Sequence, residues 1–239
     1  MTLELNFNNH VVTVDVLYRK GQHRLIIRPL AINHYRVSAP KGMPKYQIKA
    51  HLESDPSWLE NLPNIISYDE YLAQASTLKL FNEDVKVEII ESPFNEVRFR
   101  AQGLTVMMRE PNEAMKVKLL KDYFKLLLMK EVEWLETMYR RTQSVINLDA
   151  VQYRFKFYRS KFGSCHIKNR HLHFNITLVH YPKEYLDYVY AHEIAHLKVP
   201  NHGASFYSLL ETLLPRHAAL KEALNDHHKT FFIRNEAPL

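Results

Sequence analysis

The feature that most constrains this chain is a helical stretch in its last quarter that carries two histidines four residues apart. His192, Glu193 and His196 form a His-Glu-x-x-His motif, and His202 follows six residues after the second histidine. Positions four apart lie on one face of a helix, so His192 and His196 point the same way. Apolar residues cover most of the helix predicted over 183–198, which is typical of a buried helix. Three ionisable groups on a buried face need a strong partner, and a metal ion supplies one.

Two imidazoles suit zinc, and a catalytic zinc usually has three protein ligands and a water. The third ligand is either His202 or Glu211. Pro200 disfavours helix at the preceding residue, and Asn201 can cap a second helix. That second helix has an apolar stripe at helical spacing, formed by Phe206, Leu209, Leu210, Leu213 and Leu214. His202 extrapolates onto this face, which must pack against the first helix, whereas Glu211 falls on the far side. We therefore favour His202 and keep Glu211 as the weaker candidate.

Glu193 lies beside the histidine pair, where it can accept a proton from a zinc-bound water. The motif therefore predicts a zinc-dependent hydrolase. A metal-stapled adaptor that binds nucleic acid or protein without catalysis is a further alternative, although a closed structural zinc site has no use for the adjacent carboxylate.

The residues around the motif resemble those of a known family. The run Tyr188-Val189-x-Ala191-His192-Glu193-Ile194-Ala195-His196-Leu197, then Asn201-His202 and Ser205-Phe206, is similar to the YgjP-like (WLM-related) family of predicted zinc metallopeptidases. The block from Arg159 to Cys165 resembles that family's Ser-Arg-Trp-Gly-Ser-Cys signature, with Lys161 and Phe162 in place of the usual Arg and Trp. Asn175, Leu178 and Pro182 match the segment before the metal helix. The resemblance implies His192, His196 and His202 as ligands and Glu193 as catalytic base.

The resemblance and the motif favour cleavage of peptide bonds. The alternative is hydrolysis of a nucleotide phosphoanhydride, as in a nucleoside triphosphate pyrophosphatase, because a zinc-bound hydroxide could also attack phosphorus. The resemblance places Arg159, Lys161 and Ser164 near the site, so they are candidates for stabilising the developing negative charge. Asn175 would bond a substrate backbone or a ligand histidine, or be an ordinary strand-end residue. Cys165 is interpreted as a small packing group.

The rest of the chain predicts an α+β fold. Strands are expected over 3–7, 11–18, 25–27 and 35–37, and again over 85–90, 96–101 and 104–108, as two antiparallel β-meanders. The longest helical signal covers 111–143, and its Met and Trp134 stripe is interpreted as core. Strands over 153–158 and 171–176 would form a small antiparallel sheet beside a zincin-like helical metal site. We expect a β-rich region over 1–110 and a helical metallohydrolase domain over 111–239.

Composition limits the setting and the partners. The single cysteine excludes an internal disulfide framework and favours a cytoplasmic location. The first residues have neither a basic nor an apolar region typical of a secretory signal, and no apolar run is long enough for a membrane span. The net charge of +6 is compatible with a nucleotide, nucleic acid or acidic peptide. Because the charges are spread along the sequence, nucleic acid is only weakly supported.

Overall fold

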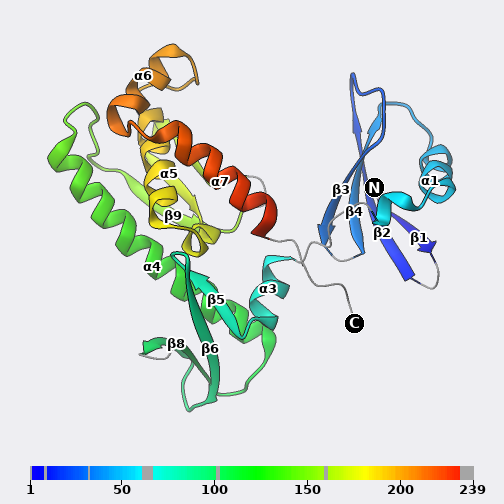
Figure 1. Ribbon diagram of the computed structural model, residues 1–239, viewed down its shortest axis with the longest axis horizontal. Coiled ribbons are helices and arrows are strands. Elements are labelled where there is room, and N and C mark those ends of the chain that lie inside the picture. Colours follow the sequence, from blue (N-terminus) through cyan, green and yellow to red (C-terminus); the bar gives the residue numbers. More distant parts are fainter. Residues whose placement is uncertain are drawn as a thin grey trace. The chain divides into compact units, whose positions relative to one another are not determined.

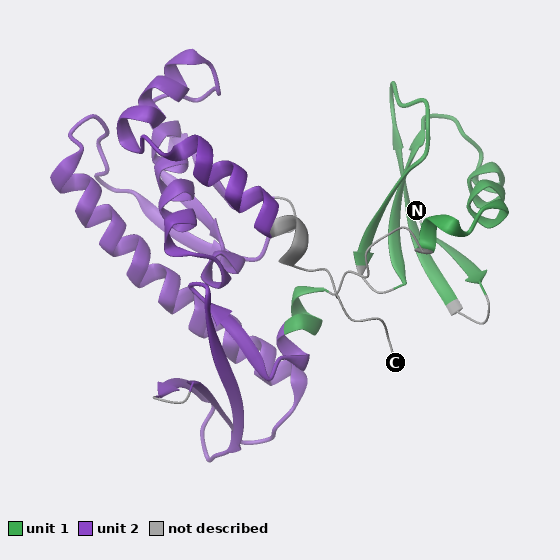
Figure 2. Ribbon diagram, viewed as in Figure 1, with its two compact units in different colours: residues 1–71, 228–239 green, residues 72–227 purple. Residues whose placement is uncertain are grey.

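The computed structural model describes residues 2–7, 10–31, 33–60, 67–100, 103–158 and 161–231. The chain forms two compact units, residues 1–71 with 228–239 and residues 72–227 (Figure 2). This division differs from the predicted boundary at residue 110. The reason is that the strands between residues 77 and 108 pack against the long helix and the segment that precedes the motif helix, all in the second unit.

The first unit is built on a four-stranded sheet. Its strands are β1 (Thr2–Phe7), β2 (His10–Arg19), β3 (Ile26–Ala31) and β4 (His34–Pro40), in the order β1-β2-β4-β3 (Figure 1). The neighbours β2 and β4 are parallel, so the predicted antiparallel meander is wrong. A turn at Gly21, with φ +76°, precedes β3 at the sheet edge, and β4 returns beside β2 after a tight turn at Asn33. This order buries Val37 and Ala39 of β4 completely.

Two helices, α1 (Lys45–Ser54) and α2 (Ser57–Glu60), follow this sheet. Ile48 and Leu52 of α1 are fully buried in its core. Trp58 meets the ring of Tyr35 edge-on at 5.0 Å, and its Nε1 donates to the Leu52 carbonyl at 2.9 Å. The first unit therefore has a hydrophobic core of its own.

The boundary between the units falls within α3 (Tyr68–Gln74), and the second unit continues with a second four-stranded sheet. Its strands are β5 (Thr77–Leu80), β6 (Glu83–Glu91), β7 (Glu96–Arg100) and β8 (Gly103–Met108), in the order β5-β6-β8-β7. The three predicted strands are β6, β7 and β8, although residue 101 lies outside the described part. The second meander is also wrong, because β8 lies between β6 and β7 and runs parallel to β6. The two sheets thus share one strand order.

The long predicted helix is α4 (Glu113–Thr142). The Asn112 side chain caps it by accepting from the Met115 amide at 2.9 Å. Its buried stripe consists of Val117, Leu120, Phe124, Leu128, Val132, Leu135 and Tyr139. Trp134 does not belong to the core as predicted, since it is 58% exposed. It precedes Leu135 of the stripe by one residue and is therefore rotated away from the buried face.

A three-stranded sheet packs beside the motif helix in this unit. Its strands are β9 (Gln152–Lys156), β10 (Gly163–His166) and β11 (His171–Asn175), in the order β10-β11-β9. The predicted antiparallel pairing is wrong, because β9 and β11 run parallel. The antiparallel neighbour of β11 is β10, which joins it through the 3-10 helix η1 (Ile167–Asn169) and a left-handed Arg170.

The remaining elements are the 3-10 helix η2 (Ile176–His180) and the helices α5 (Lys183–His196), α6 (Ala204–Leu213) and α7 (His217–Phe231). Gly203 rather than Asn201 takes the N-cap position of α6. No helix within the described residues is both long and apolar enough to cross a membrane.

Candidate metal centre and active site

α5 carries the motif and is buried on nearly every side. Pro182 precedes its first turn, and the Pro182 carbonyl accepts from the Tyr185 amide at 3.0 Å. Leu186, Tyr190 and Ile194 are at most 1% exposed. The helix contacts α4, α6 and the three-stranded sheet. This packing fixes the direction of the side chains that α5 presents to the site.

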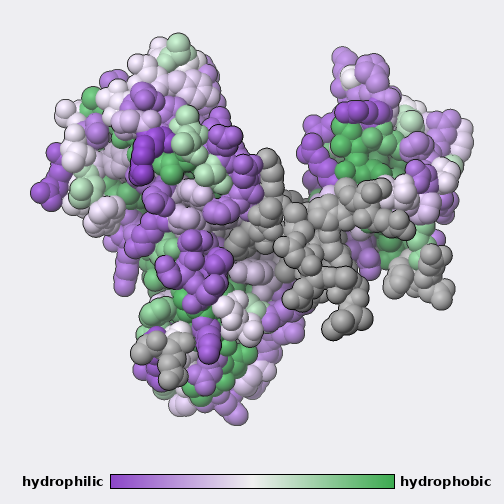
Figure 3. Space-filling model, viewed as in Figure 1, coloured by the Kyte–Doolittle hydropathy of each residue, from purple (hydrophilic) through white to green (hydrophobic). Residues whose placement is uncertain are grey.

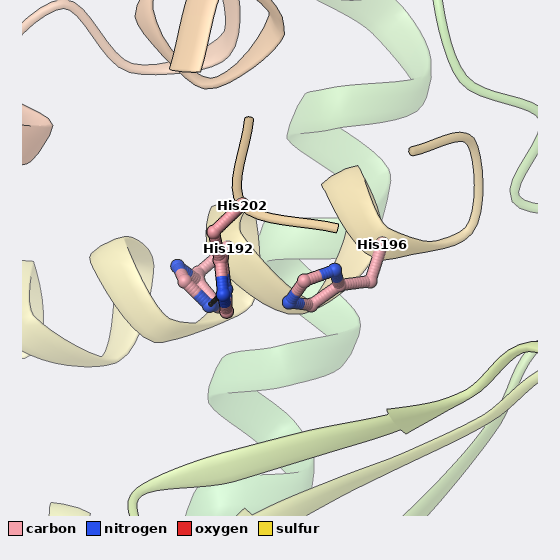
Figure 4. Close-up of side chains that lie close together, drawn as sticks. All are labelled: His192, His196 and His202. Atoms are coloured by element: carbon pink, nitrogen blue, oxygen red, sulfur yellow. Dashed lines mark hydrogen bonds between the residues drawn. The ribbon is translucent and has the colours of Figure 1, made fainter. Parts of the chain in front are cut away.

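Three histidines converge at the end of α5. His192 and His196 project from one face of the helix, and His202 reaches them from the segment before α6 (Figure 4). One nitrogen from each ring lies within 4.8 Å of the others, and the two Nε2 atoms of His192 and His202 are 3.0 Å apart. The structure therefore brings together all three residues that were predicted as ligands.

Phe206 of α6 supports the three rings from one side. It is fully buried, and its ring centre lies 5.0, 4.6 and 4.7 Å from those of His192, His196 and His202. The sequence placed Phe206 on the apolar stripe of α6 but gave no sign of this contact. α6 thus positions the imidazoles without supplying a ligand of its own.

The protonation of the histidines suits metal binding. Burial, together with the neighbouring His196 and His202, lowers the pKa of His192 to about 3. Burial also lowers the pKa of His196. Neutral imidazole is the form that binds a metal. His196 Nδ1 lies 3.2 Å from the Val199 carbonyl, so it can donate there and leave Nε2 free.

Glu193 lies inward of this cluster and is only 5% exposed. Burial raises the pKa of its carboxyl to about 8, and the charge of Lys161 offsets part of that rise. Its Oε2 and the Nδ1 of His192 are buried and have no hydrogen-bond partner among the described residues. Burial of unpaired polar atoms is costly. Because His192 faces the other histidines with Nε2, a cation bound there would relieve Oε2 of Glu193 through its water but would not reach Nδ1 of His192. The residues present thus fit a divalent metal.

Gly163 of β10 is a site residue that sequence reasoning missed. A β-carbon at this position would lie 2.6 Å from Oε1 and 2.8 Å from Cγ of Glu193. Only glycine allows the strand to approach the carboxyl this closely. A glycine inside a short strand is a signal of close backbone approach.

Glu211 is not part of the cluster. Its carboxylate lies 2.9 Å from His217 Nε2 and is largely exposed, so it faces away from the three histidines. Asn175 is buried and bonds neither a substrate position nor a histidine. Its Nδ2 donates to the carbonyls of Tyr158 and Lys161, at 2.6 and 2.9 Å, and so ties these two residues to the end of β11.

Among the other candidates, Arg159 lies outside the described residues. Ser164 is in β10, and its buried hydroxyl has no partner among the described residues. Lys161 lies close enough to Glu193 for its charge to lower the pKa of that carboxyl. Burial raises the pKa of the Cys165 thiol to about 11, and Glu193 adds to the shift, which agrees with a packing role.

A His-Glu-x-x-His helix with a third histidine at the same point defines the class of metal-dependent hydrolases. The chain belongs to the YgjP-like family: the model of its metallopeptidase domain matches residues 23–227. Because this is a family of metallopeptidases, the protein is a metal-dependent peptidase by family. Family membership therefore disagrees with the alternative of a metal-binding adaptor without catalytic activity.

The solved structures to which the chain is similar include two metallopeptidase zymogens. One is abylysin from Pyrococcus abyssi, with 17% identity and a TM-score of 0.35 over 43% of this chain and 95% of that chain. The other is jannalysin from Methanocaldococcus jannaschii, with 22% identity and a TM-score of 0.33 over the same shares. Comparison with curated proteins gives no match.

Proposed function

We propose that the protein is a zinc-dependent peptidase with a zincin-like site, in which His192, His196 and His202 hold the metal and Glu193 is the general base. The observation that carries this proposal is the convergence of three imidazoles within 4.8 Å beside a buried carboxyl. Three nitrogen ligands with a fourth position left open are the usual set of a catalytic zinc. Bound zinc would supply Lewis acidity, which acidifies a water and polarises the attacked carbonyl.

Glu193 performs the proton transfers in this proposal. It accepts the proton of the attacking water at Oε2, the oxygen that has no partner among the described residues, and returns it to the leaving amine. Its other oxygen, Oε1, faces Gly163, which prevents the carboxyl from turning towards the sheet. The carboxyl is therefore held in one orientation between the histidines and β10.

β10 is the element best placed to bind a peptide. It is an edge strand of its sheet and lies directly against Glu193. An extended peptide can add to such an edge through main-chain hydrogen bonds, which would place a peptide bond near the three histidines. Lys161, whose charge acts on Glu193, is the candidate in the described part of the chain for stabilising the negative charge that develops on the carbonyl oxygen. Ser164 alternates with Gly163 along β10 and therefore points to the other side of the strand.

The test is a substrate panel with a matched pair of variants. Zinc-loaded protein is offered unstructured peptides and nucleoside triphosphates, and the comparison is made between Glu193→Gln and Glu184→Gln, an exposed residue of the same helix. We expect cleavage of peptides, a loss of about 10²- to 10⁴-fold in kcat for Glu193→Gln, and no loss for Glu184→Gln. Zinc content should be the same in both variants.

If nucleoside triphosphates are hydrolysed and peptides are not, the protein is a nucleotide phosphoanhydride hydrolase and the peptidase proposal is wrong. Peptide cleavage that Glu193→Gln leaves unchanged would remove Glu193 as the base.

A further inference from the structure

The face of the three-stranded sheet that points away from α5 is basic. Tyr153 and Phe174 pack towards Tyr190 of α5, so the alternating residues Arg154 and His173 point to the opposite side. His173 is paired directly with Arg154 on β9 and with Ser164 on β10. We define the basic face as Arg154, Lys156, Lys161, His166, His171 and His173.

This face lies in a segment that accounts for the net charge of the whole chain. Residues 150–182 include six Lys and Arg and no Asp or Glu. Since the chain has 32 basic and 26 acidic residues, everything outside this segment is neutral on balance. In the sequence these charges are spaced apart, and the pairing of β11 with β9 and β10 brings two of them, Arg154 and Lys156, to the same side of the sheet as His166 and His173.

The basic groups contact the ring of Tyr158 and one another, and the charge of Lys161 also acts on Glu193. The Nζ atoms of Lys156 and Lys161 lie 5.0 and 4.7 Å from the centre of the Tyr158 ring, and the Tyr158 hydroxyl lies 2.7 Å from His173 Nδ1. The rings of His166 and His173 are 4.9 Å apart. Within the described part of the chain, no ion pair neutralises Arg154, Lys156 or Lys161. The positive charges of Arg154, Lys156 and Lys161 therefore attract an anionic ligand.

β10 joins the basic face to the candidate active site. Its inner side touches Glu193 through Gly163, and its outer side carries Ser164 and His166. A peptide added along this edge would point alternate side chains towards α5 and towards the basic face. The residues of the peptide on the second side would lie beside Lys161 and His166.

From this geometry we infer that the protein selects peptides with acidic residues at alternate positions, which bind to the basic face while the peptide lies along β10. This inference rests on the proposed peptidase function. A peptide fits the face better than a single-stranded nucleic acid does, because base stacking needs an open aromatic ring. The ring of Tyr158 is already contacted by two lysines.

The experiment compares zinc-loaded wild type, a basic-face variant (Arg154→Gln with Lys156→Gln) and a control (Lys118→Gln with Lys130→Gln) that removes the same charge from exposed positions of α4. Each is given peptides that differ only in Asp and Glu against Asn and Gln at alternate positions. We expect kcat/KM in the wild type and the control to favour the acidic peptide by about tenfold at low salt, and less at high salt. The basic-face variant should lose this preference and cleave the neutral peptide like the wild type.

A binding measurement separates this inference from the proposed function. Fluorescence anisotropy with the Glu193→Gln variant compares the acidic peptide, the neutral peptide and a single-stranded oligonucleotide of equal charge. If no peptide is cleaved, the proposed function fails, and tighter binding of the acidic peptide that Arg154→Gln with Lys156→Gln abolishes still supports the inference. Equal binding and cleavage of acidic and neutral peptides, a preference that survives in the basic-face variant, or tighter binding of the oligonucleotide would overturn it.

Discussion

Gly163 and Glu193 are in such close contact that a single added β-carbon at residue 163 would lie 2.6 Å from Oε1 of the carboxyl. The contact joins an edge strand to the helix that carries the three histidines. It means that the backbone of β10, and not a side chain, forms the wall of the site beside the proposed base.

The first prediction is that Gly163→Ala strongly lowers activity. The added methyl group must displace either β10 or the carboxyl of Glu193, and a misplaced base costs about 100-fold in rate. Overpacking of this kind also costs about 1–3 kcal/mol in the free energy of unfolding. Peptidase assays and urea unfolding measure the two effects.

The control for this substitution is Gly203→Ala, where an added β-carbon meets nothing within 4 Å. It should retain activity and lose at most about 1 kcal/mol in the free energy of unfolding, because alanine is a poorer N-cap than glycine. Full activity of Gly163→Ala would show that Glu193 does not need its observed position.

The second prediction concerns the third ligand. His202→Ala should bind zinc at least tenfold more weakly than the wild type, because one of three protein ligands is lost. Glu211→Ala should leave zinc affinity unchanged, since that carboxylate pairs with His217 instead. Competition with a chromophoric chelator measures both affinities. If Glu211→Ala bound zinc more weakly and His202→Ala did not, Glu211 and not His202 would be the third ligand.

The third prediction is a pH dependence of the metal-free protein caused by Glu193. The pKa of this carboxyl is raised by burial to about 8, so the folded protein holds a proton that the unfolded chain releases near pH 4.5. The folded state is therefore progressively destabilised as pH rises from about 4.5 to 8. Glu193→Gln removes this effect, and its stability relative to wild type should increase by about 4 kcal/mol between pH 5 and pH 9.

Urea unfolding in the presence of a chelator measures this difference, and Glu184→Gln is the matched control because its carboxyl is exposed. Parallel pH profiles of the wild type and Glu193→Gln would contradict the protonated state of the buried carboxyl.

The fourth prediction concerns His180 of η2, which is buried against Phe124 and whose Nδ1 lies 2.6 Å from the Lys79 carbonyl. Burial lowers its pKa to about 4. Because the unfolded chain takes up a proton near pH 6.5, stability is present above that pH and is lost as pH falls towards 4. His180 should account for about 2 kcal/mol of the loss between pH 7 and pH 5.

His180→Leu should therefore be less stable than wild type at pH 7, where the Lys79 carbonyl loses its donor, and should lose less stability on acidification. Unfolding free energies at the two pH values test this, with His166→Leu at an exposed position as the control. An equal acid loss in wild type and His180→Leu would remove His180 as the cause.

The sequence was most informative where structure is local. The helical period placed His192 and His196 on one face of α5, and the apolar stripe of α6 placed His202 towards that face and Glu211 away from it. Within the described part of the chain, the three-histidine cluster was therefore predictable from spacing alone. These relationships extend over fewer than thirty residues, within which the helix geometry leaves few alternatives.

The strand orders were not predictable in this way. Alternating apolar residues show that β2, β4, β6 and β8 are strands, but the same alternation fits a meander and an inserted strand equally well. The order is decided by packing between distant residues, as when β4 buries Val37 and Ala39 at the centre of its sheet.

Some site features depended on contacts that the sequence does not record. β10 has only four residues, Gly163 to His166, none of them β-branched or aromatic apart from the histidine ring, so it lacks the usual strand signal. Trp134 has the same apolar character as the residues of the α4 stripe, and only its position around the helix axis excludes it from the core.

In the space-filling view, hydrophobic and hydrophilic residues are interspersed on the visible surface of each unit (Figure 3).

The contact of Phe206 with all three imidazoles has a consequence for how the protein responds to metal scarcity. The rings are held in place by a core residue of α6, so most of the entropy of ordering them is lost when the chain folds and not when a cation arrives. Loss of the cation would then inactivate the protein without unfolding it. Folded, metal-free protein would persist and would regain activity when the ion binds again.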